Sequence, residues 1–428
     1  MKHIYYIVFF TILISCSSSP TNQTIEDDHI AQKNTFIYPK DAYQFQFNGR
    51  HIIVKATVND SVEISLLFDT GAQTPLFDST YTSLNKDKLG ITFQKSNSRT
   101  ITPGGIIKIN SQIVGELSIS ALGMTKKVKG RFDIADLSKS RMHTDALFPA
   151  YWFFENNIVL MDFEHQFFRI LSQDTLDNIK DQYSMFPLNG NPVTYFTIPA
   201  NVSIITENND FSLNGELVLD IGAPGFLYLQ TGKRALRDNN SPVVPVILPQ
   251  DMKVLKTTSL SWNPKKTIQR KIIYANKIYM LDSLIFQNEQ VNILDFRITP
   301  KQIGFLGNEF FRKFQVIFDY RNNMFYLKPN KEYSKLHGPF NLGMKLYRTS
   351  DSILYVNSLY KSSAIAKSGI QLGDKILKIN GKQTEEITNN ELRALEYSNP
   401  DTKITFQVQR GQEIFYYEVQ IDSLISSK

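Results

Sequence analysis

The chain has 428 residues, of which 42% are hydrophobic and 21% charged, and its formal net charge is +6. This length suits two or three domains, and the abundance of Phe and Tyr in Val- and Ile-rich tracts favours strands over helices. The single cysteine, Cys16, excludes an intrachain disulfide and a zinc site built on several thiolates.

No motif for a common cofactor is present: the sequence contains no H-E-x-x-H, no phosphate loop and no G-x-S-x-G elbow. We therefore expect no cofactor and no metal. Lys and Arg are spread along the chain, and their densest stretch, residues 253–277, alternates with Thr, Ile and Tyr. This alternation favours a solvated strand face over nucleic-acid binding.

Residues 1–15 are typical of a targeting segment, because Lys2 precedes an apolar stretch that is too short to span a bilayer as a mature helix. The end of this stretch, followed by Cys16, resembles the lipobox of bacterial lipoproteins. The resemblance implies lipidation of Cys16 and a location in the bacterial cell envelope, facing the periplasm or the cell surface. An ordinary secretory signal is the alternative. Residues 16–37 are polar and predict a flexible tether between the membrane and the folded part.

Two stretches, residues 65–72 and 216–223, share one layout, in which an apolar strand runs into a carboxylate and then a turn. The carboxylates are Asp69 and Asp220. Each is followed by a β-branched residue, a Gly and an Ala: Thr70, Gly71 and Ala72 in the first stretch, and Ile221, Gly222 and Ala223 in the second. Two carboxylates in the same context predict a pair that works together.

The surroundings of the two carboxylates also repeat. A strand hairpin is predicted at residues 158–171, and another at residues 316–327, at nearly the same distance beyond each Asp. Such a repeat predicts two similar lobes. We place lobe one at residues 38–171, a linker at residues 172–191 and lobe two at residues 192–332.

The two Asp stretches resemble the catalytic loops of aspartic proteases of the pepsin and retropepsin type. The resemblance implies a mainly β, two-lobed fold with internal duplication, in which Asp69 and Asp220 meet at a cleft as the catalytic dyad. Crowded carboxylates in such a pair share one proton. In this family the residue after each Asp bonds to the opposite loop through a hydroxyl; Thr70 has that hydroxyl and Ile221 lacks it.

Residues 338–428 resemble an α+β PDZ domain of the kind found in bacterial proteases. The resemblance is carried by residues 363–370 and 372–381. A helix with Asn389 at its start is predicted at residues 389–397. PDZ domains bind extended peptides by strand addition and capture a C-terminal carboxylate on backbone amides. The candidate carboxylate loop consists of Asn341, Leu342, Gly343 and Met344.

These features together predict a membrane-anchored aspartic endopeptidase whose PDZ domain recruits or regulates peptide or protein substrates. The alternative is a catalytically inactive protease-fold lipoprotein that binds peptides through its PDZ domain. A glycosidase with a carboxylate pair is a further class, but the D-T-G-A and D-I-G-A contexts favour the protease. No nucleic-acid partner is expected.

Overall fold

The computed structural model describes residues 36–424 except for short internal gaps: residues 103–104, 138–143, 192–194, 234, 237–239, 261–266, 282, 336–339 and 350–352. The predicted leader, Cys16 and most of the predicted tether lie outside the described residues. The chain divides into a unit of residues 1–38 and a unit of residues 39–428. In the part of the chain that is described, no helix combines the length and the apolar character needed to cross a membrane.

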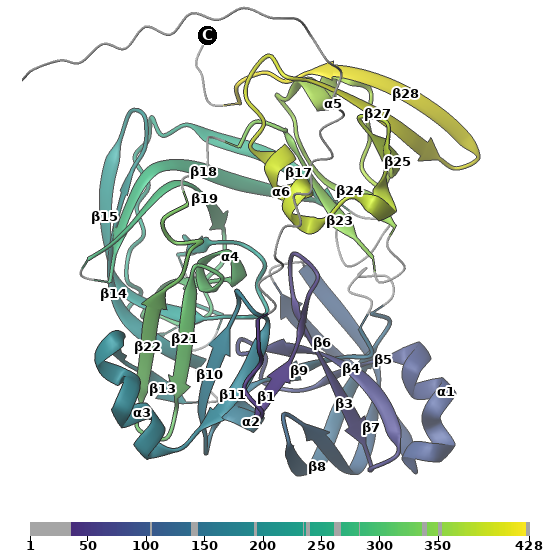
Figure 1. Ribbon diagram of the computed structural model, residues 1–428, viewed down its shortest axis with the longest axis vertical. Helices are drawn as coiled ribbons and strands as arrows, with labels where there is room; N and C mark the ends of the chain where they lie inside the picture. Colours follow the sequence, from purple (N-terminus) through teal and green to yellow (C-terminus); the bar gives the residue numbers. More distant parts are fainter. Residues whose placement is uncertain are drawn as a thin grey trace, which may run out of the picture. The chain divides into compact units, whose positions relative to one another are not determined.

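In this described part, strands form three sheets, so the prediction of a mainly β chain is confirmed (Figure 1). The first sheet has eight strands in the order β2 (Gln46–Phe47), β3 (Ile52–Val58), β4 (Val62–Asp69), β9 (Ala146–Pro149), β5 (Leu76–Asp78), β8 (Met124–Ala135), β7 (Gly105–Ala121) and β6 (Thr92–Thr102). The second has six strands in the order β1 (Ala42–Gln44), β11 (Phe167–Leu171), β10 (Ile158–Asp162), β21 (Phe314–Asp319), β22 (Met324–Pro329) and β12 (Ser184–Pro187).

The third sheet contains fourteen of the described strands. Its main path is β13 (Asn189–Asn191), β14 (Tyr195–Ile205), β15 (Asp210–Leu219), β20 (Gln302–Leu306), β16 (Leu227–Gln230), β19 (Leu284–Leu294), β18 (Thr267–Met280), β17 (Val254–Leu260), β24 (Leu354–Tyr360), β25 (Lys375–Ile379), β27 (Lys403–Arg410) and β28 (Glu413–Gln420). β23 (Met344–Arg348) lies beside β24, and β26 (Lys382–Gln383) beside β25.

Short helices connect these strands: α1 (Ser79–Leu89), α2 (Tyr151–Phe154), α3 (Gln173–Ile179), α4 (Asn308–Phe311), α5 (Ala364–Ser368) and α6 (Asn389–Glu396), with 3-10 turns η2 (Lys180–Gln182) and η3 (Thr384–Glu386). The helix predicted near residue 389 is confirmed, but its N-cap is Thr388 rather than Asn389. Thr388 and Glu391 form a capping box, in which each side chain bonds to the other residue's amide.

The sequence also predicts a hairpin before Asp69, with strands at residues 52–58 and 62–66 around a turn at Asn59 and Asp60; it is confirmed as β3 and β4, which pair antiparallel. Its turn residues, Asn59 and Asp60, have φ angles of 50° and 59°. Asn and Asp tolerate this left-handed conformation, which a two-residue hairpin turn requires. The hairpin predicted at residues 158–171 is likewise confirmed as β10 and β11.

The same order of elements occurs around both Asp residues. β4 pairs in parallel with β9, and β15 pairs in parallel with β20. A short helix and a hairpin follow each time: α2 with β10 and β11, then α4 with β21 and β22. The inner strands of the two hairpins, β10 and β21, pair antiparallel and join them in the six-stranded sheet.

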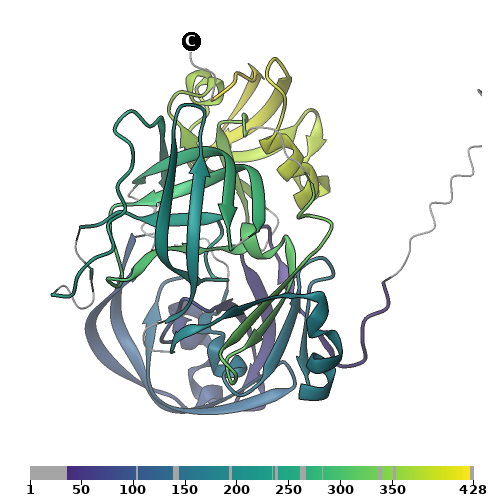
Figure 2. The same ribbon diagram turned by 90° about the vertical axis from the view of Figure 1, so that its left-hand side faces the viewer.

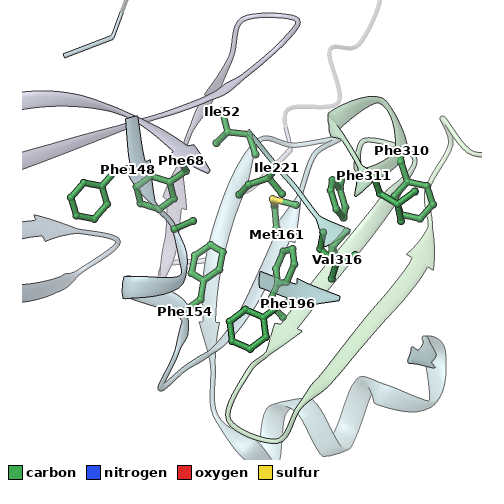
Figure 3. Close-up of a cluster of buried hydrophobic side chains, with 14 of the residues drawn as sticks. Ile52, Phe68, Phe148, Phe154, Met161, Phe196, Ile221, Phe310, Phe311 and Val316 are labelled. Atoms are coloured by element: carbon green, nitrogen blue, oxygen red, sulfur yellow. The ribbon is translucent and has the colours of Figure 1, made fainter. Parts of the chain in front are cut away.

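The largest apolar core contains side chains from both repeats (Figure 3). Phe68 and Ile221, which lie next to the two Asp residues, are both completely buried in it. Burying a side chain of this size stabilises the fold by about 1.5–3 kcal/mol. This packing anchors the strand ends that carry the Asp residues. Residues 342–421 have a separate apolar core.

The segment predicted as a linker between lobes, residues 172–191, also contributes to the fold. Ser172 caps α3 by accepting a hydrogen bond from the Thr175 amide. β12 then pairs with β22, and the buried Phe186 ring packs against Phe325.

A sheet connection joins the C-terminal segment to the preceding strands. β17 pairs antiparallel with β24 over three residues, and the hydroxyls of Ser259 and Ser358 lie 2.8 Å apart within this contact. In Figure 2 the yellow-green strands of the C-terminal segment therefore continue the green strands of the third sheet.

Candidate functional site

The two predicted catalytic carboxylates lie on short loops at the ends of equivalent strands. We call residues 69–72 the Asp69 loop and residues 220–223 the Asp220 loop. The Ala150 amide donates to the Asp69 carbonyl at 3.0 Å, and the Asp220 amide donates to the Leu306 carbonyl at 3.0 Å. The residues just beyond β9 and at the end of β20 thus fix where each loop begins.

The structure brings the two carboxyl groups together, and they hydrogen-bond to each other. Backbone amides hold each of them in place: those of Gly71 and Ala72 for Asp69, and those of Gly222 and Ala223 for Asp220. The hydrogen bonds from the two glycine amides have similar lengths, 2.7 Å from Gly71 to Asp69 and 2.9 Å from Gly222 to Asp220. The two loops therefore present their carboxylates in the same way.

Gly71 and Gly222 provide the space for this approach. A Cβ atom on Gly71 would lie 2.8 Å from the Asp220 carboxyl carbon, and one on Gly222 would lie 2.2 Å from that of Asp69. Neither glycine has a left-handed φ angle. They are needed because the opposite carboxyl group leaves no room for a side chain, rather than for a tight turn of the backbone.

Thr70 links the two loops. Its buried hydroxyl donates to the Leu219 carbonyl at 2.6 Å and accepts from the Ile221 amide at 3.0 Å. The reciprocal residue, Ile221, has no hydroxyl to return the bond. Its side chain instead lies among the apolar side chains of the core (Figure 3).

Asn308 is part of this site, although the sequence did not assign it a role. Its buried side-chain amide donates to the Ile221 carbonyl at 2.7 Å and to the Arg50 carbonyl at 2.8 Å. It therefore ties the Asp220 loop to the turn between β2 and β3. The sequence offered one signal for this role. Asn308 directly follows the apolar, Gly-containing stretch at residues 303–307, which comes after Asp220 in the chain.

The environment of the pair favours bound protons. Desolvation raises the pKa of Asp69 to about 6, although the amides of Gly71 and Ala72 and the hydrogen bond with Asp220 act in the opposite direction. Desolvation and the negative charge of Asp69 raise the pKa of Asp220 well above its ordinary value. Near neutral pH, the pair therefore carries one shared proton and one negative charge.

The candidate carboxylate loop, residues 341–344, is buried against the end of α6. The amides of Asn341 and Leu342 donate to the carbonyl of Glu396, at 3.1 and 3.3 Å. Gly343 has a φ angle of 76°, and a Cβ atom there would lie 2.2 Å from the Ser363 Cβ. The loop thus lies beside α6, and two of its amides already have backbone partners.

A cavity of about 400 Å³ lies between elements close to the Asp pair and elements of the C-terminal segment that contains the candidate carboxylate loop. It is lined by the β2–β3 turn at residues 47–50, by residues 224–226 and Tyr228 beyond the Asp220 loop, and by parts of β17, β18, β23 and α6. Asp69 and Asp220 do not line it. The cavity extends from residues just beyond the Asp220 loop to side chains of β23 and α6.

Among the described residues, no group of three or more His, Cys, Asp or Glu side chains is arranged to hold a metal ion. His51, a candidate only by residue type, is buried, and desolvation together with the charge of Arg50 lowers its pKa to about 3. Its Nδ1 atom has no hydrogen-bond partner in the described part of the chain. His51 is therefore a neutral core residue with one unsatisfied polar atom.

Comparison with protein families identifies the C-terminal segment. A family model described as a PDZ domain matches residues 341–421. The PDZ domain predicted from the sequence is therefore confirmed for these residues, and peptides or protein tails are the partners that such domains bind. A search of curated proteins gave no match.

Proposed function

We propose that the chain is an aspartic endopeptidase with a two-lobed, pepsin- and retropepsin-like β-fold, whose PDZ domain recruits or regulates its substrates. The observation that carries this proposal is the pair formed by Asp69 and Asp220, whose carboxyl groups hydrogen-bond to each other. The repeated order of strands around them supports the same conclusion. So do Gly71 and Gly222, each of which leaves room for the opposite carboxylate.

The chemistry follows from the shared proton. The ionised member of the pair takes a proton from a water molecule, which then attacks the carbon of the scissile amide. The protonated member donates its proton to the carbonyl oxygen of that amide, which gives a tetrahedral diol. The C–N bond of this diol then breaks: the carboxyl group that took the proton from water donates it to the leaving nitrogen, and the other carboxylate takes a proton from a hydroxyl of the diol, so that the pair again holds one proton. Because both pKa values are raised and the two groups are coupled, the pair gives up one proton first and retains the second. The loop amides and the Thr70 hydroxyl hold both carboxyl groups in this arrangement.

Hydrolysis of a peptide library by the purified full chain, followed by mass spectrometry between pH 4 and pH 8, tests the proposal. Asp69→Asn and Asp220→Asn should each abolish cleavage, because one carboxyl group cannot serve as both base and acid. Asp295→Asn is the matched control, since Asp295 is exposed and only pairs with Lys271. A chelator should leave cleavage unchanged and so rules out a contaminating metalloprotease.

A second candidate function is a non-catalytic, peptide-binding scaffold. The observation that favours it is Ile221, which leaves the hydrogen-bonded link between the loops one-sided. If the wild-type chain cleaves no peptide at any pH and both Asp variants behave identically to it, the scaffold is the better account. Peptide binding to the wild type would then persist without turnover.

We further propose that Cys16 carries a lipid anchor that holds the protein in the bacterial cell envelope. The support is the sequence before it, which resembles a lipobox. In the native host, Cys16→Ser should leave the chain unprocessed or release it from membranes. An intact mass that corresponds to an unlipidated N-terminus would overturn this part of the proposal.

A further inference from the structure

Three of the cationic side chains that line the cavity beside the Asp220 loop form no ion pair within the part of the chain that the structure describes. Several cations that line it are already engaged: Arg312 and Arg393 pair with Glu309, Lys331 pairs with Glu164, and Arg348 donates to two backbone carbonyls. Arg50, Arg270 and Lys345 also line the cavity, but none of them forms an ion pair with any residue whose position is described.

These three side chains come from different parts of the chain. Arg50 lies in the β2–β3 turn, with its guanidinium 5.1 Å from the centre of the Tyr347 ring. Lys345 lies on β23, with its amine 5.6 Å from the centre of the Phe340 ring. Arg270 lies on β18, and its buried Nε atom has no hydrogen-bond partner among the residues that the structure describes. The fold thus gathers three charges that the sequence separates widely.

Burial and mutual repulsion make this arrangement of positive charges unfavourable. Desolvation lowers the pKa of both Arg50 and Lys345, and the charge of Arg270 lowers each of them further. Glu396 is the anion that opposes this effect on both, yet it makes no ion pair in the described structure. A bound anion would relieve the repulsion and replace the lost hydration of the three cations.

We propose that Arg50, Arg270 and Lys345 form a subsite that binds a carboxylate group of a peptide substrate. The inference rests on the proposed peptide-directed function and specifies which peptides the chain selects. The planar guanidinium groups of Arg50 and Arg270 match a carboxylate in two-point hydrogen bonding. The cavity volume of about 400 Å³ suits part of a peptide rather than a larger ligand.

The position of the subsite relates it to both candidate sites. In the described part of the chain, β23 pairs with β24 on one side only, so a peptide can add along its other edge and reach Lys345. The opposite wall of the cavity includes Gly225 and Tyr228, just beyond the Asp220 loop. A peptide that extends from β23 toward the Asp pair therefore passes the three cations.

The test measures binding of fluorescent octapeptide libraries to the full chain carrying Asp69→Asn, so that hydrolysis plays no part. One library has a fixed Glu among randomised uncharged residues, and the other has Gln at that position. Each is made with a free and with an amidated C-terminus. A preference for Glu identifies a side-chain carboxylate as the ligand, and a preference for the free end identifies the terminal carboxylate.

Arg270→Gln should weaken binding of the preferred library by about tenfold or more, as expected for losing one partner of a buried charge pair. Arg270→Lys should retain only part of the affinity, because it keeps the charge but loses the two-point hydrogen bonding of the guanidinium group. Lys271→Gln is the control, since this neighbouring cation is exposed and pairs with Asp295. Thermal unfolding shows whether Arg270→Gln is folded. If it is not, Lys345→Gln provides the second test.

Equal binding of all four libraries would overturn the proposal, and so would an equal loss of affinity in Lys271→Gln and Arg270→Gln. Because the assay needs no turnover, these outcomes are independent of whether Asp69 and Asp220 hydrolyse peptides. Conversely, a chain that cleaves no peptide can still show the predicted carboxylate preference.

Discussion

At the scale of single residues, Thr70 is the hydrogen-bonded link between the two Asp loops. Replacing it by Val keeps the β-branched shape and removes the hydroxyl. The Leu219 carbonyl then loses its donor and the Ile221 amide loses its acceptor. Leaving such buried groups unsatisfied costs about 1–3 kcal/mol each. We therefore expect Thr70→Val to lower the free energy of unfolding by at least this amount and to reduce peptide hydrolysis sharply.

Ile221→Val is the matched control on the opposite loop. It removes one buried methylene and no hydrogen bond, so it should cost about 0.5–1.5 kcal/mol and leave hydrolysis nearly unchanged. Urea unfolding and peptide turnover, measured on both variants, separate the two effects. Similar turnover in Thr70→Val and Ile221→Val would show that the link does not support catalysis.

The Asp pair also predicts how stability depends on pH. The pKa of Asp69 is about 6 in the folded chain and 3.8 without the fold, so between these values the folded state binds more protons than the unfolded state. Stability therefore falls as pH rises from about 4 to about 6, by on the order of 1–3 kcal/mol. The raised pKa of Asp220 extends the fall to higher pH.

Urea unfolding of the wild type and of Asp69→Asn across this pH range checks the prediction. Asparagine does not titrate, so the variant should lose less stability than the wild type between pH 4 and pH 6. Parallel curves for the two proteins would mean that other groups govern the dependence. Hydrolysis by the wild type should rise over the same range, as Asp69 ionises.

At the scale of elements, the sequence predicted local structure, such as turns and strands, better than it predicted which distant segments pack against each element. The turn residues Asn59 and Asp60 mark the first hairpin because their backbone preferences are local. The helix at α6 was predicted, but its cap was placed one residue late, at Asn389 instead of Thr388, which has capping-box spacing with Glu391. Strand alternation in residues 253–277 predicted a solvated strand face, and Lys256, Lys271 and Lys277 on β17 and β18 are exposed. Arg270 instead lines a cavity, together with the distant β2–β3 turn and the PDZ segment.

The candidate site shows the same limit. Asp69 and Asp220 could be paired from sequence because each repeats the same short context. Asn308 could not be assigned, because its role depends on two carbonyls, of Arg50 and Ile221, that only the folded chain brings within reach. The sequence also could not show that two amides of the carboxylate loop donate hydrogen bonds within the chain. Their acceptor is the carbonyl of Glu396, which lies on a helix whose orientation the sequence does not specify.

At the scale of the whole molecule, the PDZ segment is joined to the rest by more than the chain connection. β17 and β24 share a ladder, and Arg393 on α6 forms an ion pair with Glu309 on α4. Glu309 directly follows Asn308, which holds the Asp220 loop through the Ile221 carbonyl. A ligand that moves α6 would therefore act on residues next to the Asp pair.

The ladder between β17 and β24 has a further consequence for truncated forms of the protein. A chain ending at Lys335 would leave β17 as an open sheet edge, with unpaired amides and carbonyls at residues 257–259. Such edges template pairing with another copy. We expect this truncated chain to self-associate, with a larger mass in light scattering than the full chain at the same concentration. In the truncated chain, the additional substitution Thr258→Lys should restore the smaller mass, because a lysine on a sheet edge opposes strand pairing between copies. If truncation leaves the mass per chain unchanged, the prediction is wrong.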